Sequence, residues 1–166
     1  MPDAWRVDKK KWQGSSFDGT GAAREGGRWN SEGVRVVYVS ANLAMAAMEK
    51  YVHLPKPVPA KMEFVRFAVD FRGTSIKRLE PEALPRGWQD SPPGGATQKI
   101  GDRWVASGET AILAVPSALI LEEVNYLLNP AHADFKRIVI GAPEVFVFDQ
   151  RIAQLHPPPS AKSGVA

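Results

Sequence analysis

Short runs of alternating apolar and polar residues predict that much of this chain forms β-strands. Residues 34–40 read Val-Arg-Val-Val-Tyr-Val-Ser and are rich in the β-branched side chains that strands favour. Residues 64–71 alternate strictly, with apolar side chains at every odd position from Val65 to Phe71, so we expect a half-buried strand there. Further short strands are predicted at residues 4–7, 111–115, 138–140 and 145–148, and at the start of residues 119–128.

Two segments show helical patterns. Residues 43–53 are filled with Ala, Met and Leu, and either Asn42 or Ser40 can cap the start of this helix. The helix has to end before Pro55, because proline lacks the backbone N–H that a helix requires. Residues 98–106 form the second predicted helix, with two large apolar side chains four positions apart.

The remaining segments indicate loops, and together the elements predict a fold class. Residues 14–33 and 85–97 are rich in Gly, Ser and Pro, and we expect the first of them to be a long functional loop. Short strands outnumber helices and do not alternate with them, which favours a single α+β domain with a bent, mostly antiparallel sheet and flanking helices. We assign residues 1–156 to this domain, and residues 157–166, composed mainly of Pro, Ser, Gly and Ala, to a flexible tail.

Composition narrows the class of protein. The 166 residues are 44% hydrophobic and 23% charged, which suits one well-packed core. The absence of cysteine excludes disulfides and cysteine-ligated zinc. The N-terminus has no apolar signal segment, and no apolar run approaches the roughly 18 residues that a membrane helix needs. We therefore expect a cytoplasmic protein with no membrane association.

The charge pattern makes direct nucleic-acid binding and metal binding unexpected. The formal net charge of +3 favours anionic ligands in general. Lys and Arg are scattered, however, and the single run, Lys9-Lys10-Lys11, is typical of a solvated turn rather than of a nucleic-acid-binding stripe. His53 and His132 have no third ligand at zinc spacing, so no metal site is predicted.

The pentapeptide Gly-Gly-Arg-Trp-Asn at residues 26–30 carries candidate binding chemistry. Its two glycines let a ligand approach the backbone closely. Arg28 presents a planar fork that suits phosphate, while Trp29 and Asn30 supply a stacking face and an amide. A turn with a surface arginine would give the same pattern, so these residues alone do not decide the function.

Tyr38 and Glu49 are the next candidates, each with a plain structural alternative. Tyr38 sits in a predicted strand, where a half-buried tyrosine is common. Glu49 lies on an apolar helical stripe, where a carboxylate is costly to bury unless it is paired or functional. The alternative is a glutamate at the edge of the stripe, either in water or paired with Lys50 or Arg66. Ser117 lacks a Gly-x-Ser-x-Gly elbow, so we predict a hydrogen-bonding or capping role rather than a nucleophile.

Taken together, these pieces resemble the RES domain family, the toxins of RES–Xre toxin–antitoxin modules. The resemblance extends from Trp5-Arg6 to about Asp149. Its specific part is the spacing of one arginine, one tyrosine and one glutamate. The matching segments are Gly26-Gly27-Arg28-Trp29-Asn30, Val36-Val37-Tyr38, the helix with Glu49 and His53-Leu54, Val115-Pro116-Ser117, and Asn125-Tyr126-Leu127-Leu128-Asn129-Pro130.

The resemblance implies a fold similar to diphtheria-type ADP-ribosyltransferase toxins and NAD+ as a consumed substrate, with no other cofactor and no metal. Glu49 would stabilise the oxocarbenium-like ribose that forms when nicotinamide leaves. Tyr38 would stack on the nicotinamide ring, and Arg28 would pair with the diphosphate. Ser117 would orient Glu49 by hydrogen bonding. The expected catalytic residues are therefore Glu49, Arg28 and Tyr38, and the expected NAD+-binding residues are Arg28, Tyr38, Ser117, Trp29 and Asn30.

Three functions remain open at this point. The first is a toxin that depletes NAD+ by hydrolysis or phosphorolysis and so arrests growth. The second is an ADP-ribosyltransferase that modifies a cellular protein. The third is a non-enzymatic, basic binding module. For the first two, the resemblance implies an Xre-type helix–turn–helix antitoxin that neutralises the toxin and binds DNA as part of the complex.

Overall fold

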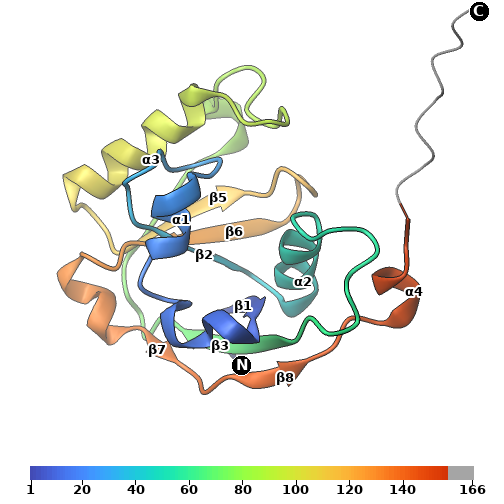
Figure 1. Ribbon diagram of the computed structural model, residues 1–166. Coiled ribbons are helices and arrows are strands. Elements are labelled where there is room, and N and C mark those ends of the chain that lie inside the picture. The colour runs from blue at the N-terminus through green and yellow to red at the C-terminus, as the bar shows by residue number, and fades with distance from the viewer. Residues whose placement is uncertain (157–166) are drawn as a thin grey trace, which may run out of the picture.

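A computed structural model describes residues 1–156, and the predicted tail at residues 157–166 lies outside the described residues. Figure 1 shows a strongly bent sheet with helices around it. Its strands are β1 (Ala4–Lys9), β2 (Val37–Ser40), β3 (Phe64–Asp70), β4 (Ile76–Arg78), β5 (Ile112–Pro116), β6 (Val124–Leu128), β7 (Val139–Ile140) and β8 (Glu144–Phe146). The helices are α1 (Thr20–Glu25), α2 (Leu43–Tyr51), α3 (Gly95–Ser107) and α4 (Gln150–Ala153), with 3₁₀ turns η1 (Lys10–Ser15), η2 (Pro81–Ala83) and η3 (Ala133–Arg137).

The strands follow the order β4-β5-β6-β2-β1-β3-β7, and β8 also pairs with β3. The β4–β5 pair is parallel and the other pairs of this sheet are antiparallel. This arrangement confirms the predicted α+β class with a bent, mostly antiparallel sheet and flanking helices. Within residues 1–156, no helix combines the length and apolar character needed to cross a membrane.

The two longer helices cover different parts of the sheet. Ala46 of α2 packs in one buried cluster with Val7 of β1 and Phe64 of β3. Trp104 of α3 packs in another with Leu113 of β5 and Leu127 of β6. Burial of such side chains removes apolar surface from water at about 25 cal/mol per Å², so each helix is held mainly by its sheet-facing side.

Helix α2 is the element that carries Glu49, and its start confirms one of the two predicted caps. The side-chain oxygen of Asn42 accepts a hydrogen bond from the backbone N–H of Met45 at 2.9 Å. The same side chain donates to Glu123 on the loop between β5 and β6, at 2.7 Å. Asn42 therefore both begins the helix and ties it to the neighbouring loop, which Figure 1 shows beside α2.

The predicted loop at residues 14–33 is only partly a loop. It contains the end of η1 and the six-residue helix α1, which is too short to show an apolar period and has no side-chain cap. The Lys9–Lys11 run closes β1 and opens η1 instead of forming a simple turn. Helix α3 also begins at Gly95, inside the second predicted loop.

The strand expected at the start of residues 119–128 was wrong, because only the second half of that segment is β6. The hydroxyl oxygen of Ser117 accepts hydrogen bonds from the backbone N–H groups of Leu119 and Ile120, at 3.1 and 3.3 Å. These bonds turn the chain immediately after β5. Both leucine and isoleucine are left about 40% exposed, so an apolar run here marks a turn.

Candidate functional site

A hydrogen-bonded carboxylate on α2 forms the first part of the site. Glu49 Oε1 accepts a hydrogen bond from Asn125 Nδ2 on β6 at 2.6 Å and from Ser117 Oγ after β5 at 3.1 Å. Ser117 is fully buried, and Asn125 is itself held because its Oδ1 accepts from Ser40 Oγ at 2.7 Å. Three elements distant in sequence thus orient one carboxylate.

The other oxygen of Glu49 is available. Among residues 1–156, no hydrogen bond reaches Oε2, and Glu49 has no ion-pair partner. The ion pair that the sequence allowed for Glu49 does not form: Lys50 pairs with Asp8 at 2.9 Å, and Arg66 pairs with Glu144 at 2.7 Å. Glu49 is anchored through one oxygen by neutral groups and presents the other with its charge uncompensated.

Tyr38 lies on β2, and its hydroxyl is locked. The O–H donates to Asn30 Oδ1 at 2.6 Å and the oxygen accepts from the backbone N–H of Trp29 at 3.2 Å. Gly27 makes this packing possible, since a Cβ there would lie 2.7 Å from the Tyr38 hydroxyl. Because the Tyr38 hydroxyl lies so close to the backbone, residue 27 has to be glycine.

The electrostatics of Tyr38 show that the predicted residues share one neighbourhood. Burial raises the pKa of Tyr38 well above its usual range, and the hydrogen bond from the Trp29 N–H opposes this. Smaller effects come from the charges of Asp102 and Glu49, which raise the pKa, and from that of Arg28, which lowers it. Tyr38 is therefore a neutral phenol near neutral pH, placed within reach of the fields of both Arg28 and Glu49.

Arg28 spans from the pentapeptide to the loop before α3. Its Nη1 donates to the backbone carbonyls of Trp88 and Asp90, at 2.6 and 2.9 Å. Within the described part of the chain it has no carboxylate partner. Arg28 thus holds the loop before α3 in place, and its positive charge is solvated here by neutral carbonyl oxygens.

Trp29 and Asn30 require a correction. Trp29 is 3% exposed and packs with Trp104 of α3. Asn30 is fully buried. Its Nδ2 donates to the carbonyls of Ala22, Ser31 and Val34, and its Oδ1 accepts a hydrogen bond from the Tyr38 hydroxyl. Because the Trp29 ring is almost completely buried and the Asn30 amide is engaged by its neighbours, these side chains hold the pentapeptide in place and do not offer the stacking surface and amide that the sequence suggests.

A cavity of about 410 Å³ lies beside Tyr38, between β1, α2 and the η1–α1 segment. This size is within the range of small-molecule sites. Four lysine or arginine side chains line it, namely Arg6, Lys9, Arg24 and Lys50, whereas Asp8 and Glu25 are the lining carboxylates. The cavity is therefore net positive and suits an anionic ligand.

Arg6 is one of the residues of this site that sequence reasoning did not single out as functional, together with Asp8 and Asn125. It donates from Nη1 to the Tyr38 carbonyl at 2.7 Å and from Nη2 to Asp8 Oδ2 at 3.0 Å. Its Nε is buried without a hydrogen-bond partner in the described residues. Arg6 lies in the strand predicted at residues 4–7, and Asp8 follows two positions later on the same face of β1, which extends to Lys9; that spacing was the available signal.

Asp8 organises the cationic wall. It is 5% exposed and accepts hydrogen bonds from Arg6, Lys50 at 2.9 Å and Ser16 at 2.9 Å. Burial alone would raise the pKa of Asp8, but the charges of Arg6 and Lys50 and the hydrogen bonds from Lys50 and Ser16 together outweigh it, so its pKa is lowered. For Lys50, burial disfavours the charged ammonium and lowers its pKa, and the negative charge of Asp8 opposes that change.

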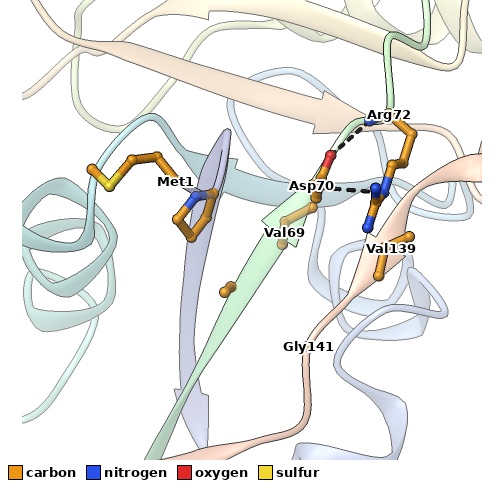
Figure 2. Close-up of a pocket in the computed structure, with 8 residues that line it drawn as sticks. Met1, Val69, Asp70, Arg72, Val139 and Gly141 are labelled. Atoms are coloured by element: carbon orange, nitrogen blue, oxygen red, sulfur yellow. Dashed lines mark hydrogen bonds and ion pairs between the residues drawn. The ribbon is translucent and has the colours of Figure 1, made fainter.

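A second, shallower cavity of about 260 Å³ lies at the far edge of the sheet. Figure 2 shows it between Met1, the end of β3 and β7, with Arg72 folded back onto Asp70. None of the predicted site residues lines it. The chemistry described above belongs to the Tyr38 side of the molecule.

Comparisons with known proteins identify related sequences along nearly the whole chain. Residues 3–149 match the RES domain. A Prs ADP-ribosylating toxin of Sphingobium sp. (strain YBL2) is 36% identical over 152 residues, covering 89% of this chain and 94% of that protein. A Toxin Res of Yersinia enterocolitica is 32% identical over 149 residues, covering 89% and 97%.

The fold recurs in a solved structure. A chain of the crystal structure of the M. tuberculosis MbcT–MbcA toxin–antitoxin complex superposes with a TM-score of 0.69, at 14% sequence identity, covering 88% of this chain and 85% of that chain. At this identity the likeness establishes a common fold.

Proposed function

Because the chain belongs to the RES domain family, we propose that it is the toxin of a toxin–antitoxin pair and that it consumes NAD+ by breaking the nicotinamide–ribose bond. The observation that supports this proposal is the environment of the Glu49 carboxylate. Its carboxylate is fixed by Ser117 and Asn125 through one oxygen, has no ion-pair partner in the described residues, and lies near Tyr38, which itself borders a basic cavity.

The proposed chemistry uses that free oxygen. Loss of nicotinamide leaves positive charge on the ribose, and a fixed carboxylate lowers the energy of such a transition state because it needs no reorganisation as the charge develops. Ser117 and Asn125 act as positioning residues. They hold Glu49 with neutral donors, so the full negative charge remains for the substrate.

Tyr38 and two arginines complete the proposed substrate contacts. The Tyr38 ring, locked through its hydroxyl, is a rigid surface for the nicotinamide. Arg6 lines the cavity, and its guanidinium suits the diphosphate. Arg28 also remains a proposed NAD+ contact: since only backbone carbonyls hold it, a phosphate oxygen can replace them without leaving a carboxylate unpaired.

The fate of the ADP-ribose defines two candidate activities. In the first, water or inorganic phosphate accepts it and NAD+ is depleted. In the second, a protein side chain accepts it. The name of the Sphingobium relative, an ADP-ribosylating toxin 36% identical to this chain, favours the second activity. The first remains our leading proposal, because Glu49 needs no protein acceptor to promote departure of nicotinamide.

We further propose that an antitoxin partner restrains this activity in the cytoplasm. The structural neighbour is part of a toxin–antitoxin complex, which supports a partner of that kind. We propose an Xre-type helix–turn–helix antitoxin that covers the NAD+ site and binds DNA itself, so the modest positive charge of the toxin serves the nucleotide and not DNA.

The test is to incubate the purified chain with NAD+ and measure free nicotinamide in three arms: buffer alone, added phosphate, and added cell lysate. Hydrolysis predicts release in buffer, phosphorolysis predicts release that depends on phosphate, and protein modification predicts release with labelled protein in lysate. Glu144→Gln, at an exposed ion pair on β8, is the control for protein handling. No nicotinamide in any arm would support the non-enzymatic binding module and overturn the proposal.

A further inference from the structure

An exposed tryptophan stands on the wall of the basic cavity. Trp12, in η1, is 45% exposed and lines the cavity on which Tyr38 also borders. Among the residues that line this cavity in the described chain, it is the one tryptophan. Trp29 and Trp104, by contrast, are almost completely buried. A large aromatic surface left open to water beside a ligand-sized cavity is available for stacking.

The backbone under Trp12 is firmly held. Its carbonyl oxygen lies 3.2 Å from Ser15 Oγ and 3.1 Å from Ser16 Oγ. Ser16 is buried and also lies 2.9 Å from Asp8, the carboxylate that organises the cationic wall. The ammonium of Lys11 sits 4.9 Å from the ring centroid. The indole is therefore mounted on the same network that positions the cations.

The kinds of side chain that line the cavity suit the parts of a dinucleotide. Tyr38 is half-buried and lines one part of the cavity, and Trp12 is an exposed lining residue. Arg6 and Lys50 line the same cavity. NAD+ likewise has a flat base at each end and a diphosphate between them. If Tyr38 receives the nicotinamide and the cations receive the diphosphate, an aromatic surface remains for the second base.

We propose that Trp12 stacks on the purine base of NAD+ and thereby selects the whole dinucleotide over its nicotinamide mononucleotide half. This rests on the proposed function, in that it names the contact for the part of NAD+ that does not react. Stacking on an aromatic side chain suits any flat base, so Trp12 contributes affinity while Glu49 contributes to bond breaking.

The experiment titrates the full chain with AMP and ADP-ribose by calorimetry and by tryptophan fluorescence. Trp12→Ala is expected to weaken binding of both by about 10-fold or more. Trp12→Phe keeps a stacking ring, so its affinity stays within about 3-fold of the native value while the fluorescence change on binding is lost. Gln13→Ala, exposed on the same 3₁₀ turn, is the matched control and behaves as the native chain.

A second measurement uses nicotinamide mononucleotide, which lacks the purine. Its cleavage or binding is expected to be the same in the native chain and Trp12→Ala, whereas the KM for NAD+ rises in the variant with little change in kcat. Equal losses for both compounds would overturn the proposal and indicate a structural role. Native affinity of folded Trp12→Ala for ADP-ribose would overturn it as well.

The outcomes separate this inference from the proposed function. Trp12-dependent binding of AMP and ADP-ribose without any NAD+ cleavage would sustain the base site and reject the enzymatic proposal. NAD+ cleavage with Trp12-independent binding would do the reverse. Absence of AMP and ADP-ribose binding to the native chain would reject the base site directly.

Discussion

Replacing Glu49 with glutamine isolates the charge of the candidate catalytic group. Glutamine has the same shape, and its amide oxygen can take the place of Oε1. It then still accepts from Asn125 and Ser117 at about the native 2.6 and 3.1 Å. The amide nitrogen takes the place of Oε2, to which no group in residues 1–156 is hydrogen-bonded. The substitution therefore removes one negative charge and no packing.

The structure sets different magnitudes for stability and for turnover. No cation in the described residues is paired with Glu49, so none is stranded, and the free energy of unfolding should change by no more than about 0.5 kcal/mol. Loss of one preorganised electrostatic contact to a transition state costs about 3–4 kcal/mol. Glu49→Gln should therefore lower kcat for nicotinamide release by about 10²- to 10³-fold.

The assay pairs nicotinamide release under saturating NAD+ with urea unfolding of the same samples. Glu123→Gln is a useful companion, because this carboxylate lies on the loop beside α2 and bonds to Asn42 rather than to the proposed substrate. It should keep kcat within a few-fold of native. A folded Glu49→Gln with native turnover would refute the assignment of Glu49, and so would an equal loss in Glu123→Gln.

Three further predictions concern the surroundings of the site. Ser117→Ala removes a donor to the charged Glu49, so kcat should fall by about 10- to 100-fold in the nicotinamide assay, and an unchanged kcat would contradict its positioning role. Gly101→Ala places a methyl group on a buried backbone carbonyl facing α3 and should lower Tm by about 5 °C or more in a calorimetric scan, whereas Gly14→Ala, with open space around it, should not. Asp8→Asn leaves two partly buried cations unpaired and should cost about 2–3 kcal/mol in urea unfolding, and a native midpoint would refute that ion-pair network. In the native protein the pKa of Asp8 is lowered from 3.8. Its contribution to the free energy of unfolding is therefore complete above that pH and is lost as the pH falls through the lower pKa of the folded state. Unfolding of the native chain and of Asp8→Asn at a series of acidic pH values should show a difference in stability that disappears in acid.

Much of the fold could be predicted because local patterns decide it. The alternation at residues 64–71 became β3, and the Ala- and Met-rich run after Asn42 became α2 with the expected cap. The errors came where the signal was not local. Helix α1 has only six residues, and the apolar run at 119–121 is turned away from the sheet by the hydroxyl of Ser117.

For the candidate site, the resemblance to the RES domain family pointed to Arg28, Tyr38, Glu49 and Ser117, each of which has a plain structural alternative when taken singly. The ordered segments that resembled the RES domain family were sufficient for the family, because such an order depends on the chain itself and not on its folded shape. Their roles in NAD+ cleavage stay predictions until the experiments above are done. The sequence also determined the class of fold, through periods of two and of 3.6 residues that each segment carries within itself.

Only the tertiary structure decided which polar groups meet. Glu49 is 68 residues from Ser117 and 76 from Asn125. Pairing of β5 with β6 places Ser117 beside Asn125, and packing of α2 against β2, the other neighbour of β6, brings Glu49 to them. The same packing buried Trp29 and Asn30, which looked like ligand contacts. A single sequence records which donors and acceptors exist, but partner choice depends on distances set by long-range strand pairing and on burial, and neither has a local signature.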